Sequence, residues 1–374
     1  MRRPSSSPLF LAAVAALALH GCQDAARPLS PTATMSAASA EPAPLVPRII
    51  APQTTDPNID WIPPFNPSIP PAIQSNNHYV WLDPSRESNG KLFVFMPGTG
   101  GFPRGNQLVQ QEAARLGYHV IGLMYQNNVG AGRCTGSPDP DCSRNMDLEI
   151  IDGVARSGIV DVSPANSIDN RLAKLLRYLD AQYPNERWSG FLKNGAPRWS
   201  RITVSGHSQG AGHAVLIGKI RRVHRVVMFS GPVFARVPGE PDAWVVSSGL
   251  TPAAKYFALM HQRDHFAAGL LPNIRALNLE DFGDPVAPEL SEPPYGGTHI
   301  LITDLEPTGG YATPNPHRST APDAWTPLGP DGTPLLRDAW RYLLGGWQLD
   351  EDDDHDDDDD EDDDRRSGNL GSQP

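Results

Sequence analysis

The feature that most constrains the fold of this chain is an alternation of strand-type and helix-type segments that begins near Asn77. The strand-type runs are almost continuously apolar, unlike the apolar-polar alternation of a half-exposed strand. Such strands are typical of a mainly parallel sheet that helices cover on both faces. We therefore predict an α/β fold in a single domain, residues 72–349. The expected strands are residues 78–82, 91–98, 119–125, 201–205, 225–231, 255–262 and 274–280, and the expected helices are residues 107–117, 167–184, 210–223 and 337–347.

The N-terminus has the pattern of an export signal, which we place at residues 1–22. Arg2 and Arg3 precede an apolar run from Leu9 to Leu19, which is too short to span a membrane. The run ends in "LHGC", which resembles the lipobox of bacterial lipoproteins and makes Cys22 the candidate lipidation site. An ordinary cleaved signal peptide is the alternative. Either reading predicts an extracytoplasmic protein, anchored in the bacterial envelope if Cys22 is lipidated and secreted otherwise.

Two segments have compositions that do not favour a packed core. Residues 23–71 are rich in Pro, Ala and Ser and are expected to form a tether, and residues 350–374 form an acidic tail. For the end of the tether, "WIPPFNPSIPP" at 61–71, packing on the body as an extended arm is the alternative. Without the acidic run at 350–364 and the two arginines after it, 29 basic and 29 acidic residues remain, so the body is neutral. No basic region suggests nucleic-acid binding. The tail lacks the spaced ligands of a calcium loop, so we expect at most a loose attraction for cations.

Cys134 and Cys142 close a short loop rich in Pro, Gly and Asp. In an exported chain this spacing predicts a disulfide. Metal binding is the weaker alternative, because two thiolates do not complete a zinc site. The surrounding stretch, residues 126–165, has no regular pattern and is expected to border the active site.

The sequence "RITVSGHSQGAGHAVLIGKI" places a serine where a strand gives way to a helix. A sharp turn at Ser208 would lift its hydroxyl above the sheet edge and crowd the positions two before and two after it, where Gly206 and Gly210 lie. The helix that follows points its N-terminus at the same centre, where it favours negative charge. We therefore interpret Ser208 as a nucleophile; a glycine-rich turn that only allows tight packing is the alternative.

With "GHSQG" at this turn and this order of elements, the chain resembles the α/β-hydrolase superfamily, and within it a group of secreted bacterial serine hydrolases and lipoproteins. The resemblance implies the chain order nucleophile, acid, histidine. The acid is expected after the strand at 255–262, at Asp264, with Asp281 and Asp284 as alternatives. The histidine is expected after a last strand at 274–280, at His299, with His317 as the alternative.

The resemblance also implies two backbone donors for an oxyanion. One is the N–H of Gln209, and the other is that of Thr99 or Gly100, in the loop after the strand at 91–98. The remaining histidines near these positions are expected to be structural or to line the pocket. They are His207, His213, His261 and His265.

A Ser-His-Asp triad implies acyl transfer to water through an acyl-enzyme, with no metal or organic cofactor. The expected function is that of an exported serine hydrolase of carboxylic esters, acting on a small or polymeric substrate. Two alternatives are an amidase or peptidase of the same fold and an inactive surface binding protein built on a hydrolase scaffold.

Overall fold

The computed structural model describes residues 45–68, 75–233, 235–309 and 314–347. The expected signal peptide at 1–22 with Cys22, residues 23–44 of the expected tether, and the acidic tail at 350–374 lie outside the described residues.

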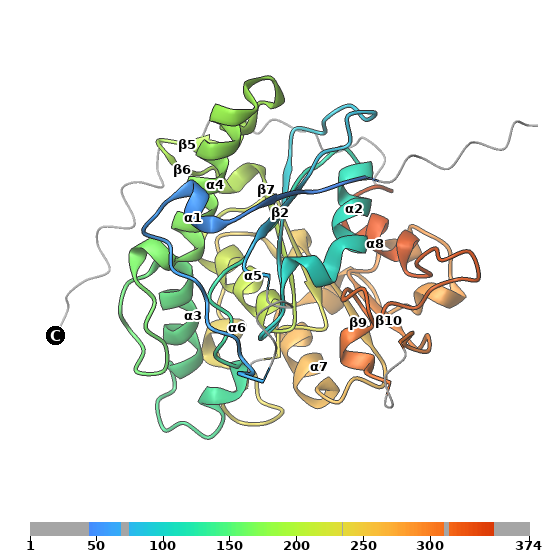
Figure 1. Cartoon of the computed structure of the whole chain (residues 1–374). Coiled ribbons are helices and arrows are strands. Elements are labelled where there is room, and N and C mark those ends of the chain that lie inside the picture. The colour runs from blue at the N-terminus through green and yellow to red at the C-terminus, as the bar shows by residue number, and fades with distance from the viewer. Residues whose placement is uncertain (1–44, 69–74, 234, 310–313, 348–374) are drawn as a thin grey trace, which may run out of the picture. The chain divides into compact units, whose positions relative to one another are not determined.

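An eight-stranded sheet forms the centre of the body, with the strand order β1-β2-β4-β3-β7-β8-β9-β10. The strands from β4 to β10 in this order are parallel, whereas β2 is antiparallel to both β1 and β4. This confirms the predicted mainly parallel α/β sheet (Figure 1). The strands are β1 (Arg48–Ile50), β2 (His78–Trp81), β3 (Leu92–Met96), β4 (His119–Gly122), β7 (Ile202–His207), β8 (Arg225–Phe229), β9 (Tyr256–His261) and β10 (Ile300–Thr303); β5 (Leu192–Lys193) and β6 (Ala196–Pro197) pair separately.

Helices cover both faces of the sheet, and each face has its own apolar core (Figure 1). Successive residues of β3 serve opposite faces: Val94 belongs to one core, and Phe93 and Phe95 belong to the other. The core with Val94 is closed by α3 (Cys142–Asp152), α4 (Ile168–Gln182), α5 (Gln209–Ile220), α6 (Ala243–Val246) and α7 (Ala267–Ala276). The other core is closed by α2 (Gln107–Arg115) and α8 (Arg337–Leu343). In the described part of the chain, no helix combines the length and apolarity needed to cross a bilayer.

The last strand is not where the sequence placed it. Residues 274–280, expected as a strand, fall in the end of α7 and the turn after it. The eighth strand is instead β10, which pairs with β9 in parallel. Pro272 lies inside α7 and interrupts its helical pattern, but Leu270 and Ile274 are buried on both sides of it, so packing maintains the helix.

The body also begins earlier than expected. The tether is expected to reach residue 71, with residues 61–71 packed on the body as the alternative, but all of residues 45–68 are part of the folded unit. β1 pairs with β2, the short helix α1 (Pro52–Thr55) follows it, and Ile59 and Ile62 are buried. Arg48 forms two hydrogen bonds of 2.6 Å with Glu186. Few apolar side chains suffice here, because Ile59 and Ile62 are almost completely buried.

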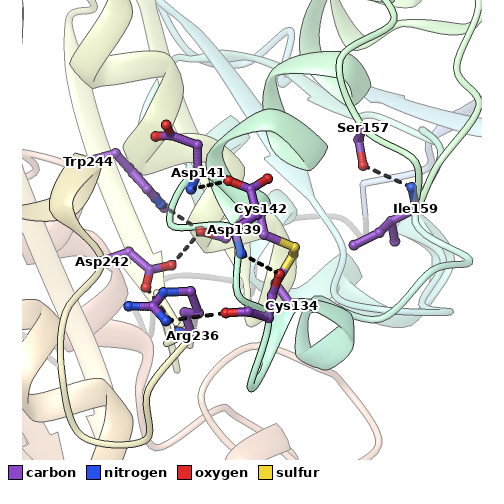
Figure 2. The surroundings of a disulfide bond; sticks show 11 residues. Cys134, Asp139, Asp141, Cys142, Ser157, Ile159, Arg236, Asp242 and Trp244 are labelled. Carbon is purple, nitrogen blue, oxygen red and sulfur yellow. Dashed lines mark hydrogen bonds between the residues drawn. A yellow bond between two sulfur atoms is a disulfide. The ribbon is translucent and has the colours of Figure 1, made fainter.

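The predicted disulfide between Cys134 and Cys142 is confirmed, with a Cα–Cα distance of 5.7 Å. The stretch around it is not wholly irregular, because α3 starts at Cys142. Figure 2 shows the loop docked against the segment of Arg236, Asp242 and Trp244. Ser143 donates a hydrogen bond to Asp242 and accepts one of 3.0 Å from the Trp244 indole. The disulfide therefore ties the start of α3 to Cys134, and Ser143 beside it joins α3 to the start of α6.

Candidate active site

Ser208 stands at the sharp turn between β7 and α5. Its backbone has φ 55° and ψ −114°, a conformation that a residue with a side chain rarely adopts. Such strain costs on the order of 1–3 kcal/mol and persists only where the surroundings enforce it. Here the Ser208 N–H donates a 2.9 Å hydrogen bond to the carbonyl of Phe229 in β8.

The glycines around Ser208 are required by the close approach of three backbones. A Cβ at residue 206 would lie 2.3 Å from the carbonyl carbon of Gly210, and a Cβ at residue 210 would lie 2.0 Å from the Met96 carbonyl oxygen. Neither position has room for a methyl group. The crowding expected from the sequence is present.

A line of hydrogen bonds joins Ser208, His317 and Asp264. The Ser208 hydroxyl lies 2.9 Å from His317 Nε2, and His317 Nδ1 lies 2.8 Å from Asp264 Oδ2. An ionised carboxylate can only accept, so Nδ1 carries the proton and Nε2 is left to accept from the serine. The other carboxylate oxygen of Asp264 accepts a 2.8 Å bond from the Phe266 N–H. The imidazole is thereby held in the tautomer that can take a proton from Ser208.

The structure corrects the expected base, because His299 does not lie at Ser208. It immediately precedes β10, at the amino end of a parallel strand, whereas Ser208 follows the carboxyl end of β7. The His299 ring is stacked between Phe257 and Phe282, at centroid distances of 4.0 and 4.1 Å. Burial there lowers the pKa of His299 to about 4.

His317, the alternative, is the first histidine after the true eighth strand. A histidine therefore does follow the last strand of the sheet, as expected, but that strand is β10 and not residues 274–280. The run "ILIT" at Ile300–Thr303, with three β-branched residues, is the signal that could have located this strand and so the histidine. The carboxylate that forms a hydrogen bond with His317 is that of Asp264, so the structure favours Asp264 over Asp281 and Asp284.

The expected oxyanion donors lie on two adjacent loops. Gln209 is the first residue of α5, where an N–H has no partner within the helix. Thr99 follows β3, and its hydroxyl donates a 2.6 Å hydrogen bond to the side-chain oxygen of Gln209. Gly100 is the poorer choice, because its N–H already donates to the carbonyl of Asn127 at 2.9 Å. The Thr99–Gln209 bond fixes the two remaining donors relative to each other.

The electrostatics favour an ionised Asp264 and an uncharged His207. Burial alone would raise the pKa of Asp264, but the hydrogen bonds from His317 and Phe266 and the charge of His317 outweigh it, so the pKa lies below its usual value. Burial and the proximity of His317 lower the pKa of His207 to about 3. Neutral His207 donates from Nε2 to the His317 carbonyl at 2.8 Å and so positions the turn that carries the base.

The other histidines have the structural or lining positions that were expected. His261 binds the backbone at Leu305 and Arg263, and His213 is buried beside Asp147. The His265 ring lies 5.3 Å from that of His317.

A cavity of about 480 Å³ lies elsewhere, between residues that include Gly90, Gly117 and His119 at the amino ends of β3 and β4. It is at the opposite edge of the sheet from Ser208. No group of three or more potential metal ligands occurs in the parts of the chain described here.

The strand order, with an antiparallel second strand, and the serine turn after β7 define an α/β-hydrolase-like fold. No family model and no curated protein matches the chain. Among solved structures it is similar to a carboxylesterase from a metagenomic library (12% identity, 82% of this chain and 90% of that one, TM-score 0.36). It is also similar to an acetyl ester-xyloside bifunctional hydrolase from Caldicellulosiruptor lactoaceticus (13%, 69% and 85%, TM-score 0.32). A third is an S-formylglutathione hydrolase from Agrobacterium tumefaciens (14%, 61% and 80%, TM-score 0.31). The activities in these names are those proteins' own.

Proposed function

We propose that this chain is a serine hydrolase that cleaves carboxylic esters. The observation that carries the proposal is the line of hydrogen bonds from Asp264 through His317 to the strained Ser208. A serine hydroxyl is a weak nucleophile, and a base in this position and tautomer activates it.

The reaction would follow from this geometry in two halves. Ser208 Oγ attacks the ester carbonyl carbon while its proton passes to His317 Nε2, and the N–H groups of Thr99 and Gln209 stabilise the oxyanion. The carbon–oxygen bond to the alcohol then breaks, and His317 returns the proton to the departing oxygen. Water, deprotonated by His317, attacks the acyl-enzyme and releases the acid and free Ser208. Asp264 stabilises the cationic His317 in both halves.

The test uses fluorophosphonate labelling and hydrolysis of p-nitrophenyl butyrate, with the p-nitroanilide of the same acid to measure amidase activity. Wild type should label and hydrolyse the ester, and Ser208→Ala and His317→Ala should lose hydrolysis. His299→Ala is the matched control and should retain it, since this ring lies at the other edge of the sheet. A folded wild type that neither labels nor hydrolyses would favour an inactive binding protein. Faster cleavage of the anilide would favour an amidase.

We also propose that the protein is exported and anchored through a lipid on Cys22, on the support of the N-terminal sequence alone. Metabolic labelling with a palmitate analogue should mark the wild type in the envelope fraction and not Cys22→Ala. Unlabelled protein released to the medium would instead indicate an ordinary cleaved signal.

A further inference from the structure

Two half-exposed phenylalanines adjoin the candidate active site, Phe65 at the loop that carries Gly100 and Phe266 at His317. Phe65 is 55% exposed and Phe266 is 45% exposed, although each packs against a part of the candidate active site. Phe65 comes from the segment before β2, and Phe266 comes from the loop between β9 and α7. An exposed aromatic ring that adjoins a reaction centre offers apolar area to a bound molecule.

Phe65 packs against the loop after β3 that contains Thr99 and Gly100, here called the oxyanion loop. A Cβ at residue 100 would be 2.7 Å from Phe65 Cβ, and a Cβ at residue 130 would be 3.8 Å from Phe65 Cε2 and 3.6 Å from the Thr99 methyl group. The segment that carries Phe65 is anchored just before it, where the Ile62 backbone exchanges two hydrogen bonds of 3.0 Å with the Asn76 amide. Phe65 therefore lies beside Gly100, on a segment whose backbone is hydrogen-bonded to the body three residues earlier.

The Phe266 ring packs against the imidazole of His317, the proposed base. Its ring centroid is 4.8 Å from that of His317, at an interplanar angle of 71°. Its N–H binds Asp264, so the backbone at this residue is tied to the carboxylate that orients the base.

The chemistry of the reaction assigns a different half of the substrate to each ring. The departing oxygen must come within reach of His317 Nε2, which protonates it, so the alcohol group lies on the side of Phe266. The carbonyl oxygen points at the N–H groups of Thr99 and Gln209. The acyl group then extends away from His317, past the oxyanion loop toward Phe65.

We infer that Phe266 forms the wall of the alcohol site and Phe65 the wall of the acyl site, so that the substrates are esters with bulky apolar groups, aromatic rings above all, on both sides of the scissile bond. This inference rests on the proposed ester hydrolysis and names its substrate class.

The test compares three esters that separate the two halves: ethyl acetate, 2-phenylethyl acetate and ethyl 3-phenylpropanoate. Wild type should prefer both phenyl-bearing esters to ethyl acetate in kcat/KM. Phe266→Ala should lower the preference for 2-phenylethyl acetate about 10-fold, and Phe65→Ala should lower that for ethyl 3-phenylpropanoate about 10-fold, as expected when one ring contact is removed. The loss should appear mainly in KM. Trp61→Ala is the matched control, a 52% exposed aromatic of the same segment, and should change neither preference.

Because each preference is a ratio within one variant, a reduced folded fraction does not affect it. Three outcomes would overturn the assignment while leaving ester hydrolysis in place. Phe266→Ala could lower only the preference for ethyl 3-phenylpropanoate and Phe65→Ala only that for 2-phenylethyl acetate, both variants could lose activity equally on all three esters, or wild type could show no preference. A wild type that cleaves p-nitrophenyl butyrate but none of the three would overturn the assignment alone, and one that cleaves none of the four would overturn the proposed function as well.

Discussion

The strained backbone conformation of Ser208 depends on two nearby glycines, which have no side chain. Gly206 and Gly210 let β3, β7 and the start of α5 approach closely enough to hold the turn. The motif could be recognised from the sequence because glycine is the one residue type that permits such an approach. His317 could not be recognised in the same way, since it lies on a three-residue turn with no motif around it and is defined only by its contacts.

Replacing Gly210 with alanine should therefore disrupt the turn. The new methyl would meet the Met96 carbonyl oxygen at 2.0 Å, and the backbone must move to relieve the overlap. We expect loss of fluorophosphonate labelling and a destabilisation of about 1–3 kcal/mol in urea unfolding. Gly158→Ala is the control, because no atom lies within 4 Å of its Cβ position. Normal labelling of Gly210→Ala would show that the turn can relax.

At the scale of elements, the two loops that supply the oxyanion donors are joined by one side-chain bond, from Thr99 to Gln209. Thr99→Val keeps the shape and the backbone N–H but removes this bond. We expect kcat for p-nitrophenyl butyrate to fall about 10-fold, less than the 10²–10³ typical for loss of an oxyanion donor itself. Thr99→Ser, which keeps a hydroxyl, should retain most of the activity. An unchanged kcat in Thr99→Val would mean that the loops hold their places without the bond.

A comparison of the expected and observed strands and helices shows how much of the fold could be predicted from the sequence. Six of the strands and four of the helices lie near their expected places, because each has a clear apolar pattern and several of them end at Gly or Pro. The errors came where a local signal opposed the packing. Pro272 interrupts the helical pattern of α7, so residues 274–280 have the appearance of a separate strand. The strand β1 has three residues and lies in a Pro-rich context, so it gives little signal. The misplaced strand alone accounts for the choice of His299.

At the scale of the whole molecule, residues 45–68 belong to the body in spite of their tether-like composition. A chain that begins at residue 72 would lose the edge strand β1, the buried Ile59 and Ile62, and Phe65. A fully buried isoleucine contributes about 1.5–3 kcal/mol. We expect the melting temperature to be at least 5 °C below that of a chain that begins at residue 45. Equal melting temperatures would show that this segment is dispensable for stability.

The body also contains several histidines that fold without charge. Burial lowers the pKa of His78 and His213 to about 3, like that of His207, from a usual 6.5. Between these values the unfolded chain binds more protons, so the free energy of unfolding should fall as the pH drops below 6.5, by up to about 1.4 kcal/mol per unit for each histidine. Asp147, Asp169 and Asp323, whose pKa values burial raises, oppose this trend, but they are fewer than the described histidines whose pKa burial lowers.

Urea unfolding at pH 7, 6 and 5 tests this expectation. Wild type should lose stability at each step, and His78→Asn should show a shallower slope whatever its stability at pH 7. A slope that is unchanged by the substitution would contradict a neutral His78.

Ser208, Asp264 and His317 reach one another from three distant stretches of the chain, and the base comes from the last of them. During synthesis Ser208 would therefore emerge long before His317, the base of the proposed reaction. A nascent chain, or a fragment cut before β10, would carry the serine without its chemistry. Turnover would then report directly on completion of the fold.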